Sequence, residues 1–148
     1  MIIRHCSGGV VFYANKVFIV RNDRGEWILP KGKIAKGQSK YESASIRIKE
    51  ETGLDVNVLE AAGDTMYEFY SRTRKQQVCN AITWYIMDTK QQEYTLHEEF
   101  SDGGFYKVKD AMNLLSHNKE KSLVEISYRK YKELKKIYNE VGISSASN

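Results

Sequence analysis

The sequence predicts an α/β fold in which a mixed β-sheet is packed between helices, an α/β/α sandwich. Segments rich in β-branched and aromatic residues alternate along the chain with segments in which apolar residues recur at helical spacing. The 148 residues are enough for one domain with a buried core. We expect a single domain over residues 1–142 and a flexible tail over residues 143–148, because "SSASN" ends the chain with small polar residues.

The strands are predicted from apolar runs bounded by turn residues. "GGVVFYANKVFIVRND" contains two such runs on either side of residues 14–16, which is typical of a hairpin. "EWILP" predicts a short strand that ends at Pro30. Farther along, "LDVNVLEAAGDTMYEFYS" and "QQVCNAITWYIMD" predict two longer strands, and "GGFYKV" predicts another short one.

Three helices are predicted. The first covers residues 40–52, with Gly53 as its stop signal. Its apolar positions are Ala44, Ile46 and Ile48. "KDAMNLLSH" predicts a short second helix, and the third covers about residues 119–140. A stripe with a period of 3.6 residues predicts the buried face of this third helix. The stripe consists of Leu123, Ile126, Tyr131, Leu134, Tyr138 and Val141.

Composition narrows the class of protein. No run approaches the roughly 18 apolar residues of a membrane span, and the N-terminus lacks the pattern of a signal peptide. Cys6 and Cys79 lack metal-binding spacing and indicate reduced thiols, Cys79 in the core. We therefore expect a cytoplasmic protein with no membrane partner. The net charge of +4 is modest and gathers in loops, which favours small anionic partners over nucleic acid.

Residues 31–54, "KGKIAKGQSKYESASIRIKEETGL", carry the clearest chemical signal. Glycines and lysines form a cationic loop at the start of a helix, where free backbone N–H groups and the helix dipole also favour an oligophosphate. Glu50 and Glu51 follow on the last turn of the helix. Magnesium is commonly held by one or two carboxylates together with phosphate oxygens. The segment therefore predicts a metal beside a bound diphosphate, or alternatively a surface helix whose charges pair with one another.

The order of these residues resembles the Nudix box of the Nudix hydrolases. That pattern is Gly, five residues, Glu, seven residues, Arg-Glu, an aliphatic residue, any residue, Glu-Glu, any residue, Gly and an aliphatic residue. The residues that fall on it are Gly32, Ile48, Glu50, Glu51, Gly53 and Leu54. "GGVVF", "WILPKG" and "FYKVKDAMNLL" resemble segments of the family outside the box. The resemblance implies a Nudix-type α/β/α sandwich and metal-dependent hydrolysis of a diphosphate linkage in a nucleotide.

Three positions depart from the family's pattern. Gln38 and Ile46 stand where a bracing Glu and Arg are expected, and losing both together leaves neither charge unpaired. Arg47 stands where the family has a Glu that helps to hold metal or activate water. It is spaced to pair with Glu50 and Glu51 on the helix, and its guanidinium cannot act as a base.

The resemblance also implies the site residues. For Mg²⁺ or Mn²⁺ we predict the ligands Gly32, Glu50, Glu51 and Glu99. For catalysis we predict Glu50, Glu51, Glu99 and Arg47, with Glu98 or His97 as alternatives to Glu99. For substrate binding we predict Lys31, Lys33, Lys36, Arg72, Arg74 and Tyr70. The "WxLPKG" sequence and the later basic turn look most like the branch acting on diadenosine or diphosphoinositol polyphosphates.

Three functions follow. The first is a Nudix pyrophosphohydrolase whose activity Arg47 would weaken. The second is a degenerate Nudix domain that binds a nucleotide or polyphosphate as a sensor without cleaving it. The third, least favoured by the modest charge, is an RNA-binding module. The sequence does not indicate an oligomeric state.

Overall fold

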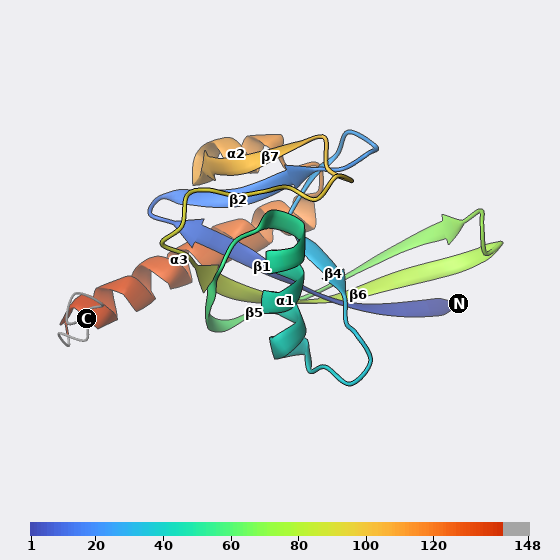
Figure 1. Ribbon diagram of the computed structural model, residues 1–148, viewed down its shortest axis with the longest axis horizontal. Coiled ribbons are helices and arrows are strands. Elements are labelled where there is room, and N and C mark those ends of the chain that lie inside the picture. The colour runs from blue at the N-terminus through green and yellow to red at the C-terminus, as the bar shows by residue number, and fades with distance from the viewer. Residues whose placement is uncertain (141–148) are drawn as a thin grey trace.

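The computed structural model describes residues 1–140, so the predicted tail over 143–148 lies outside the described part of the chain. A seven-stranded mixed sheet forms the centre of the domain, in the order β3-β2-β1-β6-β5, with β4 paired to β1 and β7 paired to β2 (Figure 1). Its strands are β1 (Ile2–Tyr13), β2 (Lys16–Arg21), β3 (Trp27–Ile28), β4 (Lys31–Lys33), β5 (Asn57–Ser71), β6 (Gln76–Asp88) and β7 (Asp102–Lys107). The sheet curls strongly, and β5 and β6 extend beyond the rest as a long hairpin.

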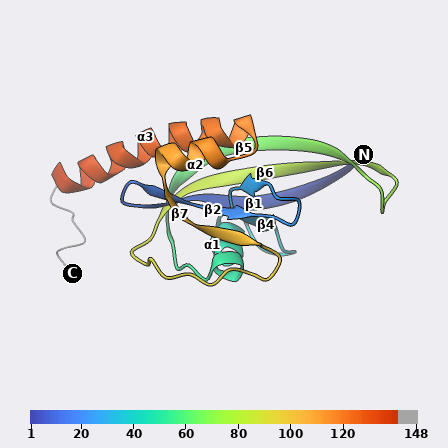
Figure 2. The ribbon, with the colours of Figure 1, turned by 90° about the horizontal axis from the view of Figure 1, so that it is seen from above.

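The helices lie on opposite faces of this sheet. Helix α1 (Lys40–Thr52) covers one face, and α2 (Val108–Leu114) and α3 (Asn118–Glu140) cover the other (Figure 2). The predicted α/β/α sandwich with a mixed sheet is therefore confirmed. None of the described helices combines the length and apolarity needed to cross a bilayer.

Alternating residues of β1 divide the core into two clusters. Val10 and Phe12 pack with the side chains of α2 and α3, whereas Val11 packs with those of α1. Strand β2 repeats the pattern, with Ile19 toward α3 and Phe18 toward α1. This is the period of two that a strand buried on both faces requires.

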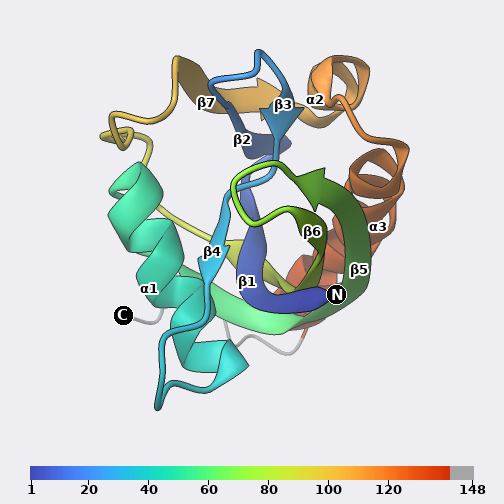
Figure 3. The same ribbon diagram turned by 90° about the vertical axis from the view of Figure 1, so that its right-hand side faces the viewer.

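Strand β1 is the central strand. It pairs in parallel with β6 along most of its length, while its other edge is shared by β4 and β2. The predicted hairpin between β1 and β2 is present, and Ala14 adopts a positive φ of 52° in its turn. Figure 3 shows β4 descending beside β1 before the chain enters α1.

Both ends of α1 have the expected capping residues. The Ser39 hydroxyl accepts a hydrogen bond from the Glu42 backbone N–H at 3.1 Å, and the Glu42 carboxylate lies 3.0 Å from that hydroxyl. Gly53 ends the helix in the left-handed conformation, with φ of 73°. The boundaries predicted from sequence, residues 40–52, are thus those of the structure.

The predicted buried stripe of α3 is only partly right. Leu123 and Tyr131 are buried as expected, but Ile126 and Tyr138 are exposed. Val141 lies outside the described residues. The residues of α3 that are buried in the structure are Glu120, Leu123, Val124, Ser127 and Tyr131. The C-terminal turns of α3 extend past the sheet, so they have no surface against which to bury apolar side chains (Figure 1).

The approach of β4 to β1 requires a glycine at position 8. A Cβ there would lie 2.6 Å from the Pro30 carbonyl oxygen, 2.7 Å from Lys31 Cβ and 2.7 Å from a ring carbon of Trp84. A Cβ at Gly9 would instead meet Met87, at 2.5 Å from its Sδ. A methionine side chain can move to accommodate a methyl group more easily than backbone can.

We therefore expect Gly8→Ala to lower the free energy of unfolding by roughly 1–3 kcal/mol through overpacking. Gly9→Ala, in the same strand, serves as the matched control and should cost less. Denaturant unfolding of the two variants measures both values. Equal costs would contradict the steric explanation.

Candidate active site

Arg47 of α1 lies directly over Gly32 of β4. A Cβ at Gly32 would lie 2.5 Å from Arg47 Cδ and 2.8 Å from its Cγ, so the glycine allows the arginine stem to pack on the strand. The guanidinium Nη1 pairs with Glu50 Oε1 at 2.9 Å. Arg47 Nε is buried and has no hydrogen-bond partner within the described residues. Of the two glutamates that Arg47 was predicted to face, Glu50 is the one it pairs with.

Glu51 occupies a different environment from Glu50. Its Oε1 is buried and has no hydrogen-bond partner among the described residues, whereas the Glu50 side chain is about half exposed, at 54%. Burial, and then the negative charge of Glu99, raise the pKa of Glu51 to about 7, although Lys31 and Arg47 oppose this shift. Glu51 is therefore the partly buried carboxylate at which a proton or cation is favoured.

The loop after β6 brings Glu99 to the end of α1. The Thr95 backbone N–H donates to the Thr52 carbonyl at 2.9 Å, and the His97 N–H donates to the Glu51 carbonyl at 2.8 Å. Nδ1 of His97 accepts a hydrogen bond from the Glu99 backbone N–H at 3.2 Å and lies 3.4 Å from Glu99 Oε1. Main-chain hydrogen bonds thus bring the loop carboxylate chosen from the sequence near Glu51.

In place of the Glu and Arg that the Nudix pattern has at positions 38 and 46, neutral groups partly brace the loop against α1. Gln38 Oε1 accepts a hydrogen bond from the Ser43 hydroxyl at 2.7 Å, which ties the loop to α1. Ser43 is fully buried. Ile46, at the position of the missing arginine, is 36% exposed, so it contributes less to the core than its apolar character predicted.

The predicted substrate-binding residues fall into two separate groups. Lys31 and Lys33 lie on β4, and Lys36 follows in the loop that leads to α1. Arg72 and Arg74 lie in the turn of the β5–β6 hairpin, and Tyr70 lies near the end of β5 and is 57% exposed. Because the tip of this hairpin extends away from α1 (Figure 1), the structure does not bring the second group together with the carboxylates.

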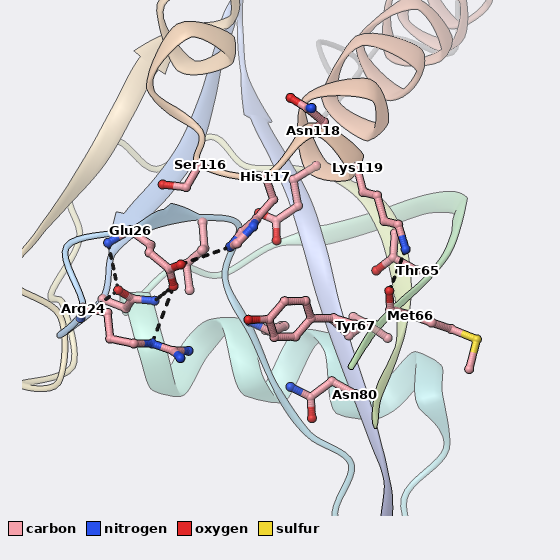
Figure 4. A pocket seen from close by; sticks show the side chains of 15 residues that line it. Arg24, Glu26, Thr65, Met66, Tyr67, Asn80, Ser116, His117, Asn118 and Lys119 are labelled. Carbon is pink, nitrogen blue, oxygen red and sulfur yellow. Dashed lines mark hydrogen bonds and ion pairs between the residues drawn. The ribbon is translucent and has the colours of Figure 1, made fainter. Parts of the chain in front are cut away.

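A cavity of about 430 Å³ opens beside Lys31, between β3, the β5–β6 hairpin and the start of α3 (Figure 4). Its polar and aromatic lining includes Glu26, Tyr67, Asn80, His117 and Glu120. The positive charge of Lys31 opposes the rise in the pKa of Glu51 and the rise in the pKa of Glu120 in the cavity, so this lysine interacts with both carboxylates. Sequence reasoning missed Asn80 and Glu120. A polar residue at a strand or helix position expected to be buried was the available signal.

The site fits a divalent cation that takes part of its coordination from a ligand. Within residues 1–140 no three His, Cys, Asp or Glu side chains form a complete metal cluster. The unpartnered Glu51 Oε1 and the nearby charge of Glu99 nevertheless form an anionic site that a cation would neutralise. Magnesium commonly uses one or two carboxylates, with phosphate and water oxygens completing its shell.

Comparison with known proteins places this geometry in a family. The family model described as NUDIX domain matches residues 4–126, which include most of β1 and all of β4, α1 and the Glu99 loop. The chain belongs to the NUDIX family. The family resemblance of the sequence is confirmed by this match.

Solved structures share the NUDIX fold at low sequence identity. The dihydroneopterin triphosphate pyrophosphohydrolase of E. coli is 13% identical with a TM-score of 0.69, and the match covers 84% of this chain and 96% of that one. An Ap4A hydrolase of C. elegans is 14% identical with a TM-score of 0.66, covering 88% and 98%. An ADP-ribose pyrophosphatase of Streptococcus suis is 18% identical with a TM-score of 0.58, covering 82% and 88%. At these identities the likeness concerns the fold.

The raised pKa of Glu51 predicts a pH-dependent stability in metal-free buffer. A carboxyl whose folded pKa lies above its unfolded value of 4.5 binds more protons when folded, so its contribution is fully present below pH 4.5 and is lost as pH rises through about 7. Glu51→Gln removes this loss. We expect the variant to gain roughly 2–3 kcal/mol relative to the native protein between pH 4.5 and 7.5.

Chemical unfolding at a series of pH values, with chelator present, measures this difference. Burial also raises the pKa of Glu120, so the variant should keep part of the overall slope. A difference between Glu51→Gln and the native protein that does not change with pH would contradict the prediction.

Proposed function

We propose that this NUDIX protein hydrolyses a diphosphate linkage in a nucleotide or dinucleoside polyphosphate, using Mg²⁺ or Mn²⁺ held by Glu51 and Glu99. The observation that carries the proposal is the partly buried Glu51 carboxylate, which has one unpartnered oxygen and a second carboxylate nearby. Burying such a charge is unfavourable unless a proton or cation compensates it. A metal-dependent site supplies that compensation.

The chain's own residues have distinct roles in this proposal. Lys31 and Lys33 bind phosphate oxygens from β4, and the charge of Lys31 acts on Glu51. Glu99, whose side chain is 56% exposed, accepts the proton that the attacking water loses as the bridging P–O bond breaks. Arg47 neutralises Glu50, which leaves Glu51 as the principal ligand of α1. The cation, when bound, neutralises phosphate charge and polarises the water.

A second candidate function is binding of the nucleotide without cleavage. The 2.9 Å pair between Arg47 and Glu50 favours it, because the guanidinium supplies at Glu50 the positive charge that a metal would otherwise bring. Arginine cannot replace a glutamate as ligand or base. Replacing Arg47 by glutamate therefore distinguishes the two candidates.

For the hydrolase, we expect metal-dependent cleavage that Glu51→Gln reduces by about 10²–10⁴-fold. The purified protein is incubated with diadenosine tetraphosphate, ADP-ribose and nucleoside triphosphates, each with Mg²⁺, Mn²⁺ or chelator, and the products are separated by chromatography. Glu42→Gln is the matched control on the same helix, because a glutamine at this position can still form the capping interaction with Ser39. It should leave the rate unchanged.

Three results are informative. Cleavage that survives in Glu51→Gln would contradict the assignment of Glu51. A silent native protein with an active Arg47→Glu variant would support the binding function. Activity in the native protein would show that Arg47 is compatible with catalysis.

A further inference from the structure

The cavity beside Lys31 adjoins the candidate active site and could hold a second part of the same ligand. Its volume of about 430 Å³ lies within the range of small-ligand pockets. Lys31 lines it and also lies close enough to Glu51 for the two charges to interact. A ligand whose phosphates bind at Lys31 would therefore place the group attached to them in this cavity.

Several side chains of the cavity with N–H groups already contact protein oxygens. Lys119 Nζ donates to the Met66 carbonyl at 2.8 Å. Three side chains converge on the Glu26 carboxylate: Asn22 Nδ2 at 3.1 Å, Arg24 Nε at 3.6 Å and His117 Nε2 at 3.6 Å. Figure 4 shows this group on one side of Tyr67. Protein oxygens thus hold these groups in place, while Lys119 and Arg24 keep further N–H groups.

Two acceptors of the cavity retain capacity. Asn80 Oδ1 is buried and has no hydrogen-bond partner among the described residues. Glu120 is 8% exposed, and its Oε1 accepts the Leu29 backbone N–H at 2.7 Å. A carboxylate can accept several further hydrogen bonds, most of them at its other oxygen. A buried acceptor without a donor is costly, so a ligand that brings N–H groups is favoured here.

The cavity also has an aromatic wall. The Tyr67 ring lies between Asn80 and the Glu26 group in Figure 4, and its centroid is 5.7 Å from that of His117. Tyr67 is 38% exposed, so part of its ring is open to a ligand. Aromatic rings are common stacking partners for flat heterocycles.

We propose that this cavity reads the base of the nucleotide, with Asn80 and Glu120 accepting N–H bonds from an edge that carries adjacent donors. Guanine has such an edge, with N1–H beside the exocyclic amino group. Adenine presents a ring acceptor beside its amino group, and uracil presents one N–H between two carbonyl groups. The inference rests on the proposed function for the position of the phosphates, and it makes Asn80 and Glu120 the specificity-determining residues.

Calorimetric titration with GMP, IMP and UMP in the presence of chelator tests the inference. These monophosphates contain no diphosphate linkage, so hydrolysis cannot affect the result. IMP differs from GMP only in lacking the amino group. We expect GMP to bind about tenfold or more tightly than IMP or UMP, since a site built to accept hydrogen bonds discriminates against a ligand that lacks the donor.

Two variants separate the roles of the lining residues. Asn80→Leu should reduce the preference for GMP over IMP at least severalfold, whereas Gln77→Leu, at an exposed position of the same strand, should keep it. Tyr67→Leu should weaken GMP and IMP equally, because stacking does not depend on the amino group. Thermal unfolding confirms that each variant is folded, and the comparison of ligands on the native protein is decisive by itself.

Equal affinities for GMP and IMP, or no measurable binding of either, would overturn the inference. Failure of the proposed function has a different signature. A preference for GMP in a protein that cleaves none of the tested substrates would support the base pocket and count against hydrolysis. Cleavage without any preference among bases would support hydrolysis and count against the base pocket.

Discussion

The fold depends on how the two edges of β1 pair with neighbouring strands. One edge pairs with β6 along eleven residue pairs from Ile2 to Phe12, while the other is divided between β4 at one end and β2 at the other. Two short pairings on one edge prevent the sheet from continuing there as a flat layer. The chain that leaves β2 must return through β3 and β4, and this return places Lys31 between α1 and the cavity. Gly8 makes the return possible, because no side chain fits between β1 and β4 at that point.

In the candidate active site, burial distinguishes the two neighbouring glutamates of α1. Glu50 and Glu51 are neighbours in sequence, yet one is half exposed and paired with Arg47, and the other has a buried, unpartnered oxygen. A helix turns by about 100° per residue, so adjacent side chains point in different directions and meet different surroundings. Arg47 therefore removes one carboxylate from the site without neutralising the other. Its stem reaches Glu50 across Gly32, where any larger residue would displace it.

Local signals were sufficient for much of the fold. The helix over residues 40–52 was predicted from its capping residues and Gly53, and the strands from their β-branched and aromatic runs, because these patterns depend on neighbours in sequence. The buried face of α3 was predicted less well, since periodicity alone does not reveal where the sheet beneath the helix ends. In the site, the choice of Glu99 followed from a family resemblance. Asn80 and Glu120 come from elements far apart in the chain, and only the packing of α3 against the sheet brings them to one cavity.

The attachment of the Glu99 loop has a mechanical consequence. The loop is held to the last turn of α1 by hydrogen bonds to the main-chain carbonyls of Glu51 and Thr52, and Gly53 fits closely against Thr95. The spacing of the two carboxylates is thus a property of the backbone at a helix end. Fraying of a single helical turn would therefore move both carboxylates at once. Local motion at the end of α1 would therefore alter the arrangement of Glu51 and Glu99 in the candidate site.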